Sequence, residues 1–258
     1  MMRCTKNKKL RKYKLITIAM VLACMNANSY ALADTINVTN ASELKAAIDS
    51  ATATAANTIV LSNDIDMSGI RDLSIKNKYV NIDGNYHGIS SSRNFALLLD
   101  TKTNLTIKNV GQVDKDYNII SSFNNNYATS GSWGGPITTQ SYPGAVTHYD
   151  DAKVVIENSV FSNNFAPTDG GVIGLQTIDF NIKDSVFINN SSAQEGGAIW
   201  AGVNYGNIEN CYFKGTWQSP LYFVHAKQEI LDTFRFDKRM ISSYTRDVLN
   251  QIEKTPNS

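Results

Sequence analysis

The sequence predicts an all-β protein, a right-handed parallel β-helix of about six turns, and three observations predict it. A period of 26 residues relates three isoleucines and three phenylalanines, Ile156, Ile182, Ile208, Phe161, Phe187 and Phe213. Short segments with alternating apolar residues lie between Asn, Asp and Gly, which is typical of strands. The segments that return the chain hold small residues and glycine pairs. A fixed period of this size indicates stacked units that cannot bury an apolar face alone.

Each repeating unit contains a phenylalanine, an asparagine and a glycine pair at fixed distances. The stretch "SVFSNNFAPTDGGVIG" spans residues 159–174, and "SVFINNSSAQEGGAIW" spans residues 185–200. In a β-helix, the phenylalanines would fill the core about 4.8 Å above their counterparts, the asparagines would bond along the stack, and the glycines would turn the corners. We therefore predict structural roles for Phe161, Asn164, Gly170, Gly171, Phe187, Asn190, Gly196, Gly197 and Phe213.

A leucine-rich repeat is the other solenoid with a compatible period. Its pattern requires a second leucine where this chain has Ser159, Ser185 and Cys211. Small residues at that position, and return segments without a helical pattern, favour the β-helix.

The first 33 residues have the composition of a secretory signal peptide. Seven Lys/Arg precede residue 15, an apolar run follows at residues 15–25, and "ALA" ends at Ala33. The apolar run is shorter than the roughly 20 residues that a membrane span needs. We expect cleavage after Ala33 and no membrane-spanning segment afterwards. The alternative is a lipoprotein box, "VLAC", which would leave Cys24 acylated.

Removing this leader changes the charge of the chain. The whole sequence has a formal net charge of +1, but without the seven leader cations it holds 17 Lys/Arg against 23 Asp/Glu, a net charge of −6. That balance argues against a nucleic-acid partner. Only Cys211 remains after cleavage, and the three histidines are dispersed, so we expect no disulfide, no metal site and no cofactor.

The rest of the chain is predicted as one β-helix domain with two irregular regions. Asn40 as N-cap and Glu43 at N3 predict a capping helix over residues 41–50. The β-helix is expected over residues 34–216. A stretch of loop-like composition interrupts it between residues 111 and 152, although "FNNN" and "GGPI" within it resemble one more turn. Residues 217–258 have a helical apolar period, which indicates either a helical cap or a truncated tail.

The repeats resemble a known family of surface proteins. "FSNN…GGVI" and "FINN…GGAI" are similar to the paired F-x-x-N and G-G-A-I repeats of polymorphic outer membrane proteins, which are autotransporter adhesins, and to adhesin-like proteins of methanogenic archaea. The N-terminal turns resemble pectin-lyase-like β-helices. The resemblance covers about residues 36–216 and implies an exported protein at the cell surface, in the outer membrane or outside the cell. No C-terminal series of alternating strands like an autotransporter's translocator follows.

Two function classes fit this scaffold. The first is adhesin-like binding of an extracellular glycan or a surface protein, without catalysis. Aromatic side chains on polar loops suit such contacts, and the candidate ligand-binding residues are Tyr127, Trp133, Tyr142, His148, Tyr149, Asp150 and Asp151. The second is a polysaccharide lyase or glycoside hydrolase. The sequence lacks the paired aspartates and arginine elements of those enzymes, so we predict no catalytic residue.

Overall fold

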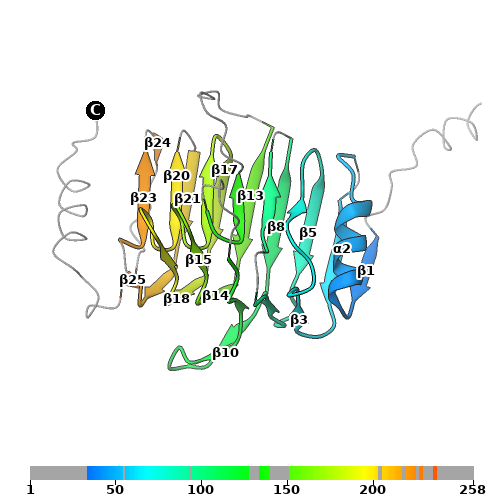
Figure 1. Cartoon of the computed structure of the whole chain (residues 1–258), viewed down its shortest axis with the longest axis horizontal. Helices are drawn as coiled ribbons and strands as arrows, with labels where there is room; N and C mark the ends of the chain where they lie inside the picture. Colours follow the sequence, from blue (N-terminus) through cyan, green and yellow to red (C-terminus); the bar gives the residue numbers. More distant parts are fainter. Residues whose placement is uncertain are drawn as a thin grey trace, which may run out of the picture. The chain divides into compact units, whose positions relative to one another are not determined.

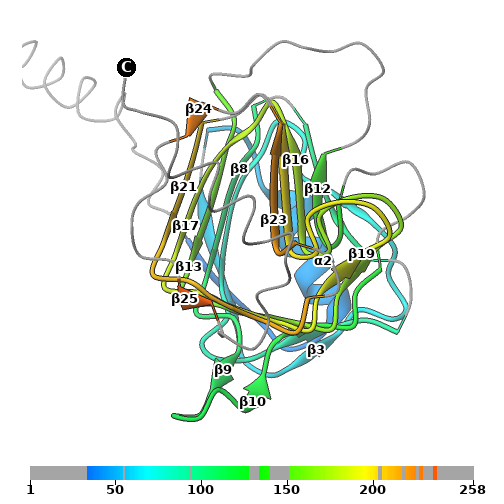
Figure 2. The same ribbon diagram turned by 90° about the vertical axis from the view of Figure 1, so that its left-hand side faces the viewer.

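The computed structural model describes residues 34–54, 56–92, 95–100, 102–127, 134–139, 151–202, 205–216, 219–224, 227–228 and 235–236. Within them, the chain coils through three parallel β-sheets that enclose a common core, as Figure 2 shows in the view along the stack. Each complete turn contributes one strand to each sheet. The predicted fold, an all-β parallel solenoid of about six turns, is confirmed.

The three sheets contain eight, seven and six strands. Sheet A contains β1 (Thr35–Val38), β2 (Asn57–Leu61), β5 (Tyr79–Asp83), β8 (Asn104–Lys108), β13 (Lys153–Glu157), β17 (Asp179–Lys183), β21 (Tyr205–Glu209) and β24 (Lys227–Gln228). Sheet B contains β3 (Ile65–Asp66), β6 (Ile89–Ser90), β11 (Phe123–Asn124), β14 (Val160–Ser162), β18 (Val186–Ile188), β22 (Tyr212–Lys214) and β25 (Arg235–Phe236). Sheet C contains β4 (Leu73–Ser74), β7 (Leu97–Leu99), β12 (Ile137–Thr139), β16 (Ile173–Gln176), β20 (Ile199–Gly202) and β23 (Leu221–Val224).

The register of the strands follows the sequence period. Ile156 pairs with Ile182 and Ile182 with Ile208 in sheet A. The looser upstream spacing is also real, because Ile82 pairs with both Ile59 and Ile107. Return segments run as strands rather than helices, which excludes the leucine-rich repeat.

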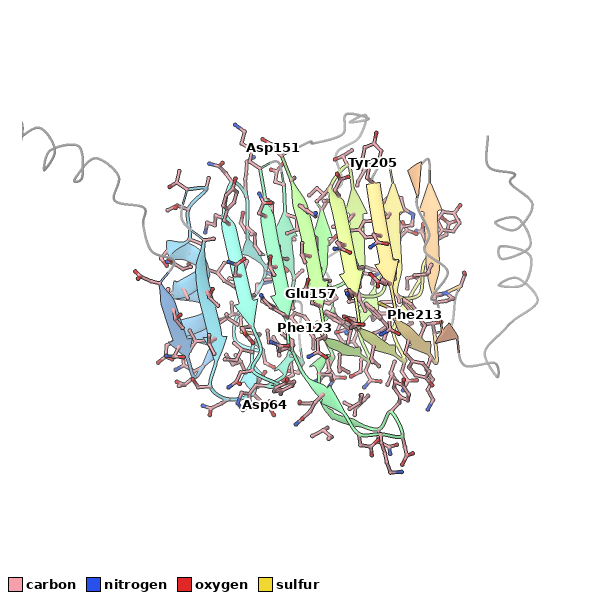
Figure 3. The ribbon with its side chains drawn as sticks, turned by 180° about the vertical axis from the view of Figure 1, so that it is seen from behind. Asp64, Phe123, Asp151, Glu157, Tyr205 and Phe213 are labelled. Carbon is pink, nitrogen blue, oxygen red and sulfur yellow. The ribbon has the colours of Figure 1, made fainter. Side chains whose placement is uncertain are left out.

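A column of aromatic rings runs through the core beside sheet B. The Phe161 and Phe187 ring centroids lie 5.1 Å apart, those of Phe187 and Phe213 lie 4.8 Å apart, and Phe123 continues the column 5.7 Å from Phe161. These rings are at most 2% exposed. Figure 3 labels Phe123 and Phe213. Phe→Ala at such sites typically costs about 3–5 kcal/mol, so the column is a main source of stability.

One helix, α2 (Ala41–Ser50), lies at the N-terminal end of the stack (Figure 1). It has the predicted bounds, and the Asn40 side chain accepts a hydrogen bond from the Glu43 amide. The Glu43 carboxylate accepts bonds from the Thr39 amide and hydroxyl, which lowers its pKa. Leu44 and Ile48 are buried, so the helix covers core that β1 and β2 would otherwise expose.

The predicted extra turn inside the irregular stretch is confirmed. Phe123 pairs with Phe161 in sheet B, and Ile137 pairs with Ile173 in sheet C. Before it the chain makes an excursion that the sequence analysis did not predict, the antiparallel pair β9 (Gln112–Val113) and β10 (Ile119–Ser121). This hairpin projects from the stack in Figures 1 and 2.

The stack continues past the predicted boundary at residue 216. Strand β23 pairs with β20, β24 with β21, and β25 with β22. The spacing between paired residues shortens from 26 to 22, as between Ile199 and Leu221, so this turn does not follow the 26-residue period. Within the region predicted as a helical cap or a truncated tail, the described segments β23, β24 and β25 are strands. The other residues of the predicted C-terminal region, 217–218, 225–226, 229–234 and 237–258, lie outside the described part of the chain, as do residues 1–33, which were predicted to be a signal peptide.

Candidate binding surface

The repeated asparagines form a hydrogen-bonded ladder inside the turns. Asn164 Nδ2 donates to the Phe123 carbonyl at 2.9 Å and to Asn190 Oδ1 at 3.0 Å. Asn164 Oδ1 accepts from the amide of Asn126 at 3.1 Å and from its Nδ2 at 3.0 Å. Asn190 Nδ2 donates to the Phe161 carbonyl at 3.0 Å. All three side chains are buried, so they hold the stack together and do not face a ligand.

The glycine pairs bring successive corners into contact. Gly170 and Gly196 have φ angles of 60° and 63°, in the left-handed region that favours glycine. A Cβ on Gly171 would lie 2.2 Å from the Gly197 carbonyl oxygen, and a Cβ on Gly135 would lie 2.2 Å from that of Gly171. The spacing of these corners excludes any larger side chain, and they have a structural role.

A second ladder involves Ser159, Ser185 and Cys211. The Val110 amide donates to Ser159 Oγ and the Ser159 amide donates to Ser185 Oγ, at 3.3 and 3.2 Å. Cys211 takes the next position, and burial raises its pKa to about 12. A thiol with that pKa is unreactive at neutral pH.

Most of the predicted ligand-binding residues fall outside the described residues. Trp133, Tyr142, His148, Tyr149 and Asp150 belong to this group. Tyr127 is 45% exposed, and its ring centroid lies 5.8 Å from that of Phe165 in β15 (Phe165–Ala166), which pairs with β19 (Ser191–Ser192). Asp151 is exposed just before β13, at the upper margin in Figure 3. The structure therefore does not bring Tyr127 and Asp151 to one sheet.

Three exposed apolar residues that sequence reasoning missed lie on the hairpin and at the corner to which it is bonded. Tyr86 is 51% exposed, Ile119 37% and Ile120 61%. Ser121 Oγ donates to the Tyr86 carbonyl at 2.6 Å, and the Gly111 amide donates to the His87 carbonyl at 2.9 Å, which ties the hairpin to this corner. We call Tyr86, Ile119 and Ile120 the hairpin residues. Apolar residues on both sides of "DKDYN" were the signal that could have revealed it.

Side-chain contacts fix the hairpin in place. The Tyr117 ring stacks on Tyr212 of β22, with centroids 4.1 Å apart. Asp114 accepts hydrogen bonds from the amides of Asp116 and Asn118 and from Asn118 Nδ2, all within 2.9 Å. Those hydrogen bonds lower the pKa of Asp114, and the bond from the Asn118 side chain has the largest effect. The carboxylate therefore stays charged at neutral pH.

The outer face of sheet A offers a second surface. Tyr79 and Tyr205 start β5 and β21 and are 37% and 51% exposed. Along the same face, a column runs through Asp83, Lys108, Glu157, Lys183 and Glu209, and the last two form an ion pair at 3.9 Å. The charges alternate in sign, so they stabilise one another across strands.

Two acidic groups show what the carboxylates of this fold do. Ser68 holds the pKa of Asp66 low through its hydroxyl and amide. Asp169 is only 5% exposed, and burial raises its pKa, helped by the charge of Glu195, although the Glu195 amide donates to it at 3.0 Å. Both carboxylates cap turns. Within the described ranges, no group of three or more His, Cys, Asp or Glu could hold a metal ion.

One known protein family matches the chain, and the matched residues lie in the turns just described. Residues 158–176 and 184–202 match the model of the Chlamydia polymorphic membrane protein repeat. The chain carries two polymorphic membrane protein repeats. Each repeat spans a sheet B strand, the buried asparagine, the glycine corner and a sheet C strand, so the motif specifies most of one coil.

The predicted resemblance to polymorphic outer membrane proteins is confirmed by these repeats together with the solenoid. No curated protein and no solved structure matches the chain. Among the residues that the structure describes, no helix has the length and apolar character needed to cross a membrane. The repeats and the fold fit a surface protein.

Proposed function

We propose that the protein is an exported, cell-surface β-solenoid with an adhesin-like role. It binds a glycan or a protein of a host or neighbouring cell, and it does so without catalysis or a cofactor. The observation that carries the proposal is the contrast between the two kinds of side chain in this fold. The repeat residues are buried and make the contacts that hold the stack together. Tyrosines and isoleucines on fixed segments remain exposed.

Rigid exposed aromatic residues are suited to recognition because they give a large contact area at little entropic cost. Tyr79 and Tyr205 provide such area on sheet A, and the hairpin residues provide it at the hairpin and its corner. The carboxylates of Asp66 and Asp114 cap turns and are kept ionised, which is unsuited to a general acid. The polymorphic membrane protein repeats support the surface location.

The test is a glycan array and a panel of purified surface proteins probed with the full protein. We expect saturable binding to at least one class. Tyr205→Ala and Tyr79→Ala should reduce glycan binding, whereas Asn57→Ala, at the start of another sheet A strand, should not. Failure of the wild-type protein to bind either class, or cleavage of a bound polysaccharide, would contradict the proposal.

A further inference from the structure

The side chains of each sheet A strand alternate between the core and the outer face, because successive residues of a strand point to opposite sides. In β5, Val80 and Ile82 are buried, and Tyr79, next to Val80, is 37% exposed. In β21, Ile208 is buried and Tyr205, three residues earlier, is 51% exposed. Both tyrosines therefore lie on the outer face of sheet A.

The strand register places these two tyrosines in one row that crosses the sheet. The row runs from β5 through β8, β13 and β17 to β21, and the Tyr205 amide donates to Asp179 Oδ1 of the preceding strand at 2.7 Å. Three strands separate the tyrosines, so their Cα atoms lie four strand spacings, about 19 Å, apart along the stack. We call this set the tyrosine row, and it consists of Tyr79, Asn104, Lys153, Asp179 and Tyr205.

Polar groups of complementary kinds fill the row between the tyrosines. The Asn104 amide can donate and accept hydrogen bonds, the Lys153 ammonium donates, and the Asp179 carboxylate accepts. The adjacent outward row of the same sheet consists of Asn81, Thr106, Val155, Asn181 and Asn207. Sugar hydroxyls both donate and accept, so a chain of sugars can bond to each of the polar groups in these rows.

The charges on this face alternate in sign. Lys153 and Asp179 are neighbours in the tyrosine row, and Lys183 forms an ion pair with Glu209 at 3.9 Å. No single sign is available to attract a polyanion such as an acidic glycan or a nucleic acid. A protein interface usually has an apolar centre and a polar rim, whereas here the aromatic rings stand at the two ends of a polar row. The arrangement suits a neutral glycan better than either class.

We infer that the tyrosine row binds a neutral, linear glycan that lies along the stack and contacts one tyrosine ring at each end. Neighbouring strands are about 4.8 Å apart, which is close to the advance per sugar of an extended β-linked chain, so about five sugars would reach from Tyr79 to Tyr205. Each ring offers a rigid apolar face and a polar tip, which suits contact with a sugar. Figure 3 labels Tyr205 at the start of its strand. This inference rests on the proposed binding role and names the ligand class for one surface.

The test measures the affinity of the full protein for soluble oligosaccharides of increasing length by isothermal titration calorimetry. The probes are neutral β-linked oligomers of cellulose, galactan, mannan and chitin, from the disaccharide to the hexasaccharide, and oligomers of galacturonic acid as the charged comparison. We expect at least one neutral series to bind more tightly than the acidic series. Its affinity should rise roughly five-fold or more between the trisaccharide and the pentasaccharide, because only the longer chain reaches both rings.

Three variants locate the contacts. Tyr79→Ser and Tyr205→Ser should each remove the rise in affinity with chain length, since one end contact is lost. Tyr86→Ser is the matched control, because Tyr86 is also 51% exposed but lies at the corner between β5 and β6, and it should keep the rise. Circular dichroism spectra and melting curves matching the wild type would establish that each variant folds.

The inference is overturned if the affinity does not depend on chain length, if galacturonic acid oligomers bind as tightly as every neutral series, or if Tyr86→Ser weakens binding as much as Tyr205→Ser. If no neutral oligomer binds while the surface-protein panel shows saturable binding, the tyrosine row is refuted as a glycan site and the proposed function stands. Absence of binding by the wild-type protein to the oligomers, the glycan array and the protein panel would refute the proposed function itself.

Discussion

Asn164 offers a sharp test of the hydrogen-bonded ladder because one atom can be exchanged. Asn164→Asp replaces the amide nitrogen with oxygen in a side chain that is 1% exposed. The new oxygen would face the Phe123 carbonyl and Asn190 Oδ1, both of which now accept hydrogen bonds from Nδ2. Two attractive contacts become repulsive, and a charge is buried whose remaining hydrogen bonds are the two from Asn126.

The expected loss is large compared with the stability of a domain. Leaving a buried polar group unsatisfied costs about 1–3 kcal/mol, and an uncompensated buried charge costs about 3–5 kcal/mol. We expect Asn164→Asp to lose at least about 3 kcal/mol at pH 7. Asn164→Ala removes all four side-chain hydrogen bonds, at about 1 kcal/mol each, so it should lose about 4 kcal/mol.

The pH dependence gives the reasoning a second readout. Burial raises the pKa of the introduced carboxyl in the folded state above its unfolded value, so the ionised form destabilises the fold. Lowering the pH through that raised pKa neutralises the group and lets it donate one hydrogen bond. The deficit of Asn164→Asp should therefore shrink between pH 7 and about pH 4, whereas that of Asn164→Ala should not.

Urea unfolding followed by circular dichroism measures these free energies. Asn181→Asp is the matched control, because Asn181 lies on the outer face of sheet A and its Oδ1 already accepts from Asn207 Nδ2 at 3.1 Å. It should change stability by less than about 0.5 kcal/mol. A loss below about 1 kcal/mol for Asn164→Asp, or a deficit independent of pH, would refute the ladder as a stabilising element.

Three further predictions address corners and buried groups. Gly171→Ala should lower the melting temperature strongly, since the new Cβ would lie 2.2 Å from the Gly197 carbonyl oxygen. Gly69→Ala is the control, because a Cβ there has no atom within 4 Å, and it should leave the melting temperature unchanged. Cys211 should react with a thiol reagent only after unfolding, because its pKa is about 12, and rapid reaction of the folded protein would contradict its burial. Asp169→Asn should raise the unfolding free energy at pH 7, because it removes a buried carboxylate whose pKa is raised by burial. In urea titrations this gain should vanish below about pH 3.8, the ordinary pKa of the carboxyl, where the wild-type group is protonated in both states; a loss of stability at pH 7 would disprove the reasoning.

The sequence predicted those parts of the fold that repeat. Phe161, Phe187 and Phe213 recur because each must lie over its neighbour, so the physical contact is visible as a period. The capping helix was also predictable, since Asn40 and Glu43 act locally.

Features without a counterpart in other turns were not predictable in this way. The hairpin occurs once, and its Tyr117–Tyr212 contact joins residues that no period relates. The C-terminal turn was missed because Leu221 follows Ile199 by 22 residues rather than 26. Of the predicted ligand-binding residues, Tyr127 and Asp151 are the ones within the described part of the chain, and the others stay predictions.

Neither the sequence pattern nor the composition predicted which apolar residues are exposed. Tyr86 and Ile120 come from different turns, and their exposure depends on the corner to which the hairpin is bonded. Such exposure is a property of three-dimensional packing, because a single exposed apolar residue is unremarkable in sequence.

The most direct test of the central claim, binding without turnover, is the mass of a ligand recovered from the protein. A polysaccharide or surface protein captured by the full chain would be incubated, eluted and measured by mass spectrometry. The account predicts that the ligand is recovered with its mass unchanged. Recovery of shortened chains, or of chains ending in an unsaturated uronate, would contradict it and establish the polysaccharide-cleaving alternative.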